Sequence, residues 1–226
     1  MSHSVDRKAS GPTTAAGATA LAAVSRWLTR FRAAKPVHPR GVVLPAVLTR
    51  DGSAVPWGVP FLDDRGRDAG VVRLSRSLGL PPPWPDVMGM ALRLDGECGP
   101  YDLLLDTTGM RPVLRHAPAP RRDPLRAAYG SLFPYDAEGT RVILSAVPGT
   151  GSDTHVAFVL RVATVTGPWW PFGTLLVERP DDRHADAPVD FDPVLNHVPG
   201  LPQAAPFAAL RQPSYAAARR IRHGDA

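Results

Sequence analysis

The sequence predicts one mainly β domain of the α+β class, built as an antiparallel barrel or sandwich with a helix at each end. Eight short apolar runs follow one another between residues 41 and 180, and Gly, Pro and Asp separate them. The hydrophobic fraction of 44% over 226 residues is enough to build a core. Neither an internal repeat nor a linker divides the rest of the chain, so we expect residues 35–226 to form a single domain.

The chain begins with a segment of different composition. Residues 1–13 are small and polar, which is typical of a disordered tail. Residues 13–34 show helical periodicity, and the apolar side chains on one face of that helix are Leu21, Val24, Leu28 and Phe31. We therefore expect residues 1–34 to be a tail followed by an amphipathic helix that packs on the domain.

The expected strands follow in order from residue 41. They are the runs GVVLPAVLTR (41–50), GVPFL (58–62), AGVVRLSRS (69–77), VMGMALRLDG (87–96), YDLLLDTT (101–108), TRVILSAVP (140–148), THVAFVLRVATVTG (154–167) and FGTLLVERP (172–180). A more helical stretch at 119–131 interrupts the series, and GTGSD at 149–153 is typical of a hairpin turn. A second helix is expected from Arg211 to Arg222, after the Pro-rich stretch VPGLPQAAP.

Composition excludes several classes of protein. The formal net charge is +5, but the arginines are scattered among acidic stretches such as DDRHAD (181–186), so nucleic acid is not an expected partner. Cys98 is the single cysteine, which leaves no internal disulfide and no Cys-based zinc site. No apolar run has the length of a transmembrane helix or the form of a signal peptide, and we expect a cytoplasmic protein.

Three places before residue 110 carry side chains that are candidates for catalysis or ligand binding. Alternation puts Arg73 and Ser75 on one face of a strand, either inward, where the arginine needs an anion, or outward as a solvated polar face. His38 precedes the first strand, either as a proton-transfer group in a pocket or as a surface loop histidine. Asp102 and Asp106 flank an apolar run. These carboxylates could serve acid–base catalysis or metal binding, or they could be capping and solvated groups near the strand ends.

The C-terminal helix carries a tyrosine among arginines. Helical spacing places Arg211, Tyr215 and Arg219 on one face. An arginine one turn away favours the phenolate form of a tyrosine, and a phenolate can bind iron. The alternative is a basic terminal helix whose tyrosine packs against the domain. Motifs for a phosphate loop, a zinc protease or a hydrolase nucleophile elbow are not present in the sequence.

Taken in order, the motifs resemble those of catalases. VHPRG (37–41) is similar to V-H-x-[KR]-G before the first barrel strand, VRLS (72–75) to V-R-[FL]-S, and DVMGMALRL (86–94) to D-x-x-G-[FM]-A-[VL]-[KR]-[FL]. The later matches are YDLLLDTTG (101–109), FGTLLVERP (172–180), VDFDPVLNHVPGL (189–201) and the final R-x-x-x-Y with its arginines. The chain thus resembles a minimal, truncated catalase-fold haem protein, a catalase-related peroxidase. That resemblance implies an antiparallel eight-stranded β-barrel with an N-terminal and a C-terminal helix.

The resemblance also implies a cofactor and roles for particular residues. The cofactor would be haem b, with the Tyr215 phenolate as its iron ligand. Distal chemistry would fall to His38 as proton carrier, to Ser75 as the group that orients it, and to Asp106, which stands where catalases carry asparagine. An ionised carboxylate cannot donate a hydrogen bond to peroxide as an amide does. The other implied cofactor contacts are Arg211, Arg222, Arg73, Lys35 and Val37.

The expected activity is haem-dependent peroxidase activity with weak catalase activity, through a ferryl intermediate. The large helical domain, arm and wrapping segment of full catalases are absent, so we expect an open site, in a monomer or homodimer, that takes hydrogen peroxide or organic hydroperoxides and a small-molecule reductant. One alternative is a non-enzymatic haem-binding or degenerate catalase-fold protein, and another is a metal-dependent hydrolase such as a phosphodiesterase. The N-terminal helix would cover the haem edge, support a dimer or contact a membrane.

Overall fold

The computed structural model describes residues 40–97, 99–187 and 189–204. The helices expected at 13–34 and 211–222 lie outside these ranges. The strands are β1 (Arg40–Arg50), β2 (Gly66–Arg76), β3 (Met88–Gly96), β4 (Gly99–Thr107), β5 (Tyr129–Gly130), β6 (Tyr135–Ala137), β7 (Thr140–Pro148), β8 (His155–Thr164) and β9 (Trp170–Glu178). Helical structure in the described residues is limited to α2 (Pro60–Asp63) and 3-10 turns at Leu114–His116 and Pro124–Arg126. None of these helices is long and apolar enough to cross a membrane.

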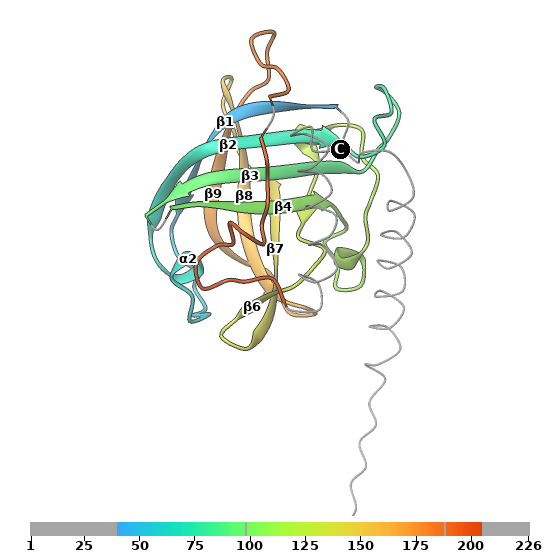
Figure 1. Cartoon of the computed structure of the whole chain (residues 1–226). Helices are drawn as coiled ribbons and strands as arrows, with labels where there is room; N and C mark the ends of the chain where they lie inside the picture. Colours follow the sequence, from blue (N-terminus) through green and yellow to red (C-terminus); the bar gives the residue numbers. More distant parts are fainter. Residues whose placement is uncertain (1–39, 98, 188, 205–226) are drawn as a thin grey trace, which may run out of the picture.

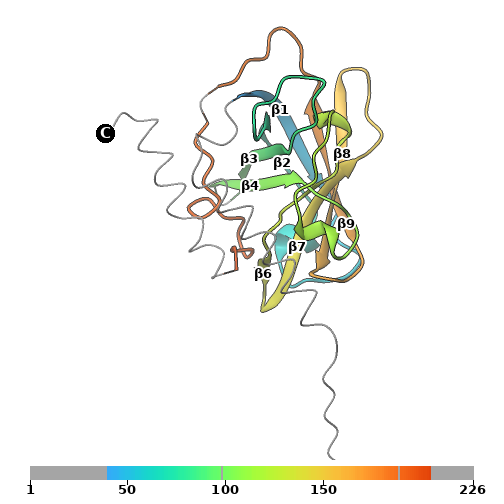
Figure 2. The same cartoon turned by 90° about the vertical axis from the view of Figure 1, so that its right-hand side faces the viewer.

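The strands close into an antiparallel barrel. The sheet order is β5-β4-β3-β2-β1-β9-β8-β7-β6, and a further pairing of β5 with β7 joins the two ends into a ring of eight strands with β6 beside it. In Figure 1, β1 to β4 run across the front and β7 to β9 pass behind them, and Figure 2 shows the same barrel from the side. The structure therefore confirms the barrel and excludes the sandwich.

Alternation along the strands fills the barrel with apolar side chains. One set of alternate positions points inward and forms the core, and the other set points outward. On β2 the inward residues are Val72 and Leu74, so Arg73 and Ser75 point outward. The largest fully buried side chains of the core include Leu44, Leu48, Met90, Leu92, Tyr129, Phe158 and Phe172.

The prediction of a strand at GVPFL (58–62) is wrong. Residues Pro60–Asp63 form the single helical turn α2 instead. The Asp63 carboxylate explains the change, because it accepts hydrogen bonds from the backbone N–H groups of Trp57, Gly58 and Val59 at 2.7 to 3.2 Å. Proline at the start of the turn supplies no N–H to a sheet and suits the first turn of a helix.

The helical stretch expected at 119–131 is also mostly wrong, and its end supplies the missing strand. Only Pro124–Arg126 is helical, as one 3-10 turn to which the Asp123 side chain contributes by accepting the N–H of Leu125 at 2.8 Å. Tyr129 and Gly130 then form β5, which pairs with β4 on one side and β7 on the other. Two residues thus close the barrel, too few for a periodicity to reveal.

The segment after β9 returns across the outside of the barrel. In Figure 1 it descends, orange to red, in front of β1 to β4. Asp102, on the outer face of β4, holds it there. Its carboxylate accepts two hydrogen bonds from Arg93 at 2.8 and 2.6 Å, one from the backbone N–H of Asp192 at 2.6 Å and one from Asn196 at 3.0 Å. Asp102 is therefore a structural carboxylate rather than a capping group at a strand end.

Candidate functional site on the outer face of the barrel

A row of small and polar residues crosses the outer face of five neighbouring strands. Gly41 pairs with Ser75, Ser75 with Gly89, Gly89 with Asp106 and Asp106 with Gly130, so these five residues lie side by side on β1 to β5. We call them the outer row. Although they point away from the core, Ser75 and Asp106 are only 7% and 8% exposed. A buried surface outside the core is where a ligand or a covering segment can lie.

The outer row brings together two of the predicted catalytic residues. Ser75 and Asp106 are two strands apart, which corresponds to about 9 to 10 Å between their backbones. Gly89 stands between them and contributes no side chain, so no side chain separates Ser75 from Asp106 along the outer row. The Ser75 hydroxyl donates a long hydrogen bond of 3.5 Å to the carbonyl of Gly89. The backbone of Gly89 therefore forms the floor between the serine and the carboxylate.

Thr108 adds a hydroxyl that the sequence did not single out. It lies two residues beyond Asp106, is 0% exposed, and within the described residues its Oγ1 has no hydrogen-bond partner. A Cβ on Gly130 would come within 2.6 Å of that oxygen, so glycine at 130 makes room for the hydroxyl beside Asp106. A buried hydroxyl without a partner is costly, and a ligand at the outer row is one partner it could serve.

Arg73 provides the cation at the β1 end of the outer row. Its Nε and Nη2 each donate to one carboxylate oxygen of Asp186 at 2.7 Å, which is a two-pronged ion pair. The guanidinium lies across Gly41, because a Cβ there would be 2.8 Å from its Cζ. The Arg73 hydrogen bond holds the pKa of Asp186 below its usual range, against a smaller opposing effect of burial. Arg73 points outward and is only partly buried, and the anion that it pairs with is supplied by this chain.

The segment that carries Asp186 lies along an edge of β1. Strand β9 pairs with β1 only from Ala46 to Arg50, which leaves the first half of β1 without that neighbour. There, Val43 donates its backbone N–H to the carbonyl of Ala185 at 3.1 Å, and Gly41 donates its own to Asp186 Oδ2 at 3.0 Å. We call residues 179–187 the strap. It covers the part of β1 that borders the outer row.

Strand pairing continues the line of the outer row beyond β5 to a cluster of arginines. Gly130 pairs with Ser145, and Ser145 with Arg161 on β8. The Cζ atoms of Arg161 and Arg115 lie 5.3 and 4.4 Å from the ring centroid of Trp169. Burial lowers the pKa of both arginines, and for Arg115 the charge of Arg161 lowers it further. Arg115 also donates to the carbonyls of Thr164 and Gly167, so backbone oxygens and the indole face stabilise this cluster.

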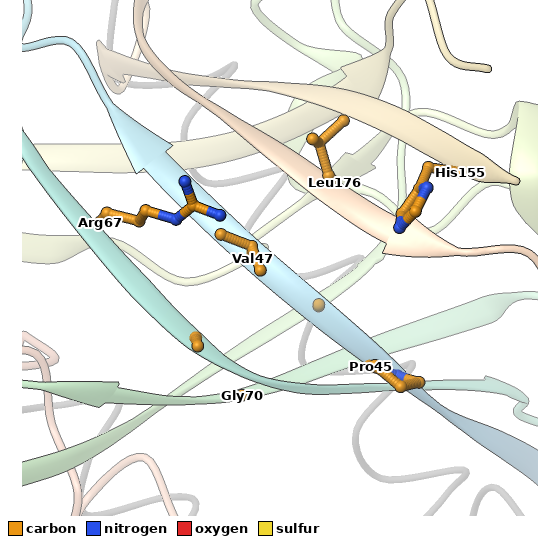
Figure 3. A pocket seen from close by; sticks show the side chains of 8 residues that line it. Pro45, Val47, Arg67, Gly70, His155 and Leu176 are labelled. Atoms are coloured by element: carbon orange, nitrogen blue, oxygen red, sulfur yellow. The ribbon is translucent and has the colours of Figure 1, made fainter.

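A hollow of about 320 Å³ lies further along the outer face of β1 and β2. Figure 3 shows it with Arg67 on one side of Val47 and His155 on the other. Its lining is otherwise Pro45, Ala46, Ala69, Gly70 and Leu176. The lining contains no carboxylate and none of the residues of the outer row, so we place the candidate site at the outer row.

The structure describes three of the predicted site residues. Arg73 and Ser75 share one face of β2, as alternation predicted, and that face is the outer one; Asp106 lies on the same outer face and shares the outer row with Ser75. The remaining predicted residues lie outside the described residues and stay predictions; they are Lys35, Val37, His38, Arg211, Tyr215 and Arg222. Thr108 and Asp186 were missed, although DTTG and the acidic stretch 181–186 contain them. Spacing along the chain gives no sign that either meets the outer row.

The described part of the site fits a flat, acidic cofactor such as haem. The outer row offers a low, buried floor, Thr108 offers a buried hydroxyl, and Arg73 offers a guanidinium fork that suits a carboxylate. That fork already holds Asp186. In the ranges that the structure describes, no group of three or more His, Cys, Asp or Glu side chains is arranged to hold a metal ion.

The fold is similar to that of catalases. Catalase A from Saccharomyces cerevisiae superposes with a TM-score of 0.58 at 13% identity, over 87% of this chain and 63% of that one. A fungal catalase superposes with a TM-score of 0.60 at 15% identity, over 97% of this chain and 66% of that one. The chain thus spans just under two thirds of the length of either catalase, and the likeness concerns the fold. No protein-family model and no curated protein sequence matches the chain.

Proposed function

We propose that this protein binds haem b against the outer row and reduces peroxides there. The observation that carries the proposal is the outer row itself, a buried floor of glycines with Ser75 and Asp106 on the outside of a catalase-like barrel. Beside it lies the Thr108 hydroxyl, which has no hydrogen-bond partner among the described residues. The similar structures are catalases, and they suggest the class of reaction. Their identities of 13% and 15% leave the activity of this chain to experiment.

The residues that would hold the cofactor come from both ends of the chain. Tyr215, as phenolate, would bind the iron, and Arg211, one helical turn before it in the sequence, would stabilise the negative oxygen. Arg222, Lys35 and Arg73 would pair with the acidic groups of the macrocycle, and Val37 would contact its face. Bound haem supplies a redox-active iron at which the oxygen–oxygen bond of a peroxide can be cleaved.

The residues around the outer row would then manage protons. His38, three residues before Gly41 in the sequence, would accept the proton of the hydroperoxide and return it to the leaving oxygen. Ser75, the register partner of Gly41, would orient the imidazole. Thr108 would donate the hydrogen bond to the substrate that an ionised Asp106 cannot donate. The substrates would be hydrogen peroxide or organic hydroperoxides with a small-molecule reductant, and dismutation would be weak.

A second candidate is a haem-binding protein of the same fold that has lost turnover. Asp106 favours it, since it stands where catalases carry an asparagine, and an ionised carboxylate cannot donate the hydrogen bond that an amide gives to peroxide. Peroxide turnover separates the two candidates, because a protein that only binds haem shows a spectrum without a rate.

The test is an absorption spectrum of the full chain expressed with a haem precursor. We expect a ferric Soret band in the wild type that is lost or shifted in Tyr215→Phe and kept in Tyr129→Phe, a matched change of a barrel tyrosine. His38→Ala should keep the band and lose peroxidase activity towards an organic donor. A wild-type protein that takes up no haem during expression or in vitro would refute the proposal. A dismutation rate near that of a full catalase, without activity on organic donors, would refute its peroxidase part.

A further inference from the structure

We propose that Asp186 is an internal carboxylate that occupies Arg73, and that an acidic group of the porphyrin must displace it to bind at the β1 end of the outer row. The strap would then regulate cofactor binding by competition for one guanidinium. The identity of the ligand rests on the proposed function, whereas the contacts that carry the inference belong to the described chain.

Asp186 already makes the contacts that a ligand carboxylate would make. Both of its oxygens lie 2.7 Å from nitrogens of Arg73, in the parallel geometry with which arginine binds any carboxylate. Oδ2 also accepts the backbone N–H of Gly41 at 3.0 Å. The two anions cannot use the same prongs of Arg73 at once, so the binding of one excludes the other.

The exposure of the pair permits exchange. The side chain of Asp186 is 35% exposed and that of Arg73 is 18% exposed, so solvent reaches the carboxylate from outside. Ion pairs with this access to water contribute little net stability. Beyond the side chain of Asp186, the backbone hydrogen bond described between the strap and β1 runs from Val43 to Ala185. An incoming carboxylate therefore has few described contacts to replace.

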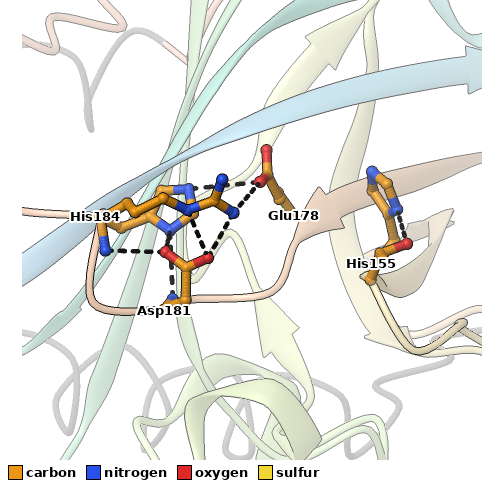
Figure 4. A network of polar contacts seen from close by, with 6 residues as sticks. His155, Glu178, Asp181 and His184 are labelled. Atoms are coloured by element: carbon orange, nitrogen blue, oxygen red, sulfur yellow. Dashed lines mark hydrogen bonds and ion pairs between the residues drawn. The ribbon is translucent and has the colours of Figure 1, made fainter.

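The other end of the strap has an anchor of its own. His184 Nδ1 lies 2.9 Å from Asp181 Oδ1, and Arg183 Nη2 lies 2.6 Å from Asp181 Oδ2. Both side chains also approach Glu178, at the end of β9, at 3.8 Å (Figure 4). The contacts of Arg183 and His184 with Glu178 can thus hold the strap on β9 while residues 185 and 186 leave β1. The displacement is therefore reversible.

Arg73 stays beside the outer row in either case. The guanidinium lies across Gly41, where a Cβ would be 2.8 Å from Cζ and 2.8 Å from the carbonyl of Leu74. Gly41 is the register partner of Ser75, so a carboxylate that replaces Asp186 arrives next to Ser75. This position suits the acidic edge of a flat ligand that lies along the outer row.

The experiment measures porphyrin affinity rather than activity. The full chain is compared as wild type, Asp186→Asn and Asp182→Asn, since Asp182 is an exposed carboxylate of the same strap and its substitution removes the same charge. The probe is iron-free protoporphyrin IX, followed by quenching of tryptophan fluorescence. We expect Asp186→Asn to bind it roughly two- to fivefold more tightly, as loss of a weak competing ion pair predicts. Asp182→Asn should match the wild type.

The dimethyl ester of protoporphyrin IX shows whether the carboxylates are responsible. Its affinity should be equal for all three proteins, because it has no acid to place on Arg73. A gain by Asp186→Asn that the ester shares, or no gain with the free acid, would overturn the inference while leaving the proposed function in place. Absence of porphyrin binding by every protein would overturn both.

Amide hydrogen exchange of the wild type gives a readout that needs no variant. Saturating protoporphyrin IX should speed exchange at Gly41 and Val43, whose N–H groups the strap protects, and leave Val72 and Leu92 in the core strands unchanged. Slower exchange at Gly41 and Val43 on binding would mean that the strap tightens on the ligand, contrary to the inference.

Discussion

Arg73 and Asp186 are 113 residues apart in the sequence and form a two-pronged ion pair, 2.7 Å on each prong, across the first strand of the barrel. The pair joins β2 to the strap and requires glycine at position 41 beneath it. A cation that motif matching assigns to a cofactor is therefore already engaged by the protein. This relationship sets the first prediction.

Asp186→Asn should lower stability at neutral pH and leave it unchanged in acid. The pKa of Asp186 is depressed in the folded protein, so its contribution is present above the pKa of the unfolded state, about 3.9, and is lost as the pH falls through the lower folded pKa. Because the pair is partly exposed, we expect a difference of about 1 kcal/mol or less in the free energy of unfolding.

The measurement is urea denaturation of both proteins between pH 2 and 7. The curves of unfolding free energy should converge below about pH 4. Salt at 1 M should also reduce the difference, since it screens an exposed pair. A gap that is as wide at pH 2 as at pH 7 would contradict the ion-pair origin.

Thr108→Val should stabilise the protein without cofactor. The hydroxyl of Thr108 is fully buried, and the described residues offer it no partner, so an isosteric methyl group removes a desolvation cost of about 1 kcal/mol. The check is the midpoint of thermal unfolding of the cofactor-free protein, with Thr108→Ser as the control that keeps the hydroxyl. A lower midpoint for Thr108→Val would mean that the hydroxyl is already satisfied in the free protein.

Gly130→Ala should destabilise the barrel through its contact with Thr108. The new Cβ would approach Oγ1 to 2.6 Å, which forces a shift that costs about 1 to 3 kcal/mol in a packed site. In a Thr108→Ala background the oxygen is gone, so the same change should cost much less. A double-mutant cycle of unfolding free energies measures the coupling, and additive effects would show that the two residues do not touch.

Asp102→Asn should destabilise the fold more than any of these changes. Asp102 is 1% exposed, and its carboxylate accepts four hydrogen bonds from Arg93, Asp192 and Asn196. The hydrogen bond with Asp102 raises the pKa of Arg93, so the neutral amide loses the stabilisation of that cation. We expect a loss of about 3 kcal/mol in chemical denaturation.

Asp95→Asn is the matched control for that experiment, because Asp95 lies on the neighbouring strand with an exposed side chain. Its unfolding free energy should stay within about 0.5 kcal/mol of the wild type. Equal effects of the two substitutions would show that Asp102 does not hold the returning segment.

Periodicity predicted the long strands well and the short elements badly. β1, β2, β3, β4, β7, β8 and β9 each have nine or more residues and lie where alternation placed them. GVPFL was expected as a strand because it is apolar, yet the Asp63 carboxylate turns it into a helical turn. β5 has two residues, and only its pairing with both β4 and β7 makes it a strand.

The same division holds for the site. Alternation was sufficient to place Arg73 with Ser75 on one face, because side chains two apart on a strand point the same way. The resemblance to catalases pointed to Asp106, and the register of β2, β3 and β4 set it beside Ser75 across Gly89. Thr108 and Asp186 could not be found by spacing, since their importance depends on Gly130 and Arg73, which meet them only through tertiary contacts.

The sequence alone determined the long strands, which of their side chains share a face, and the order of the motifs. These depend only on local periodicity and on the order of residues along the chain. Tertiary structure decided which strands close the barrel, that Asp102 anchors the returning segment, and that the cation beside Ser75 is held by Asp186. The last two outcomes depend on contacts between residues 90 and 113 positions apart. Such contacts form only when sheet register and loop closure bring the partners together, and no periodicity along the chain encodes that distance.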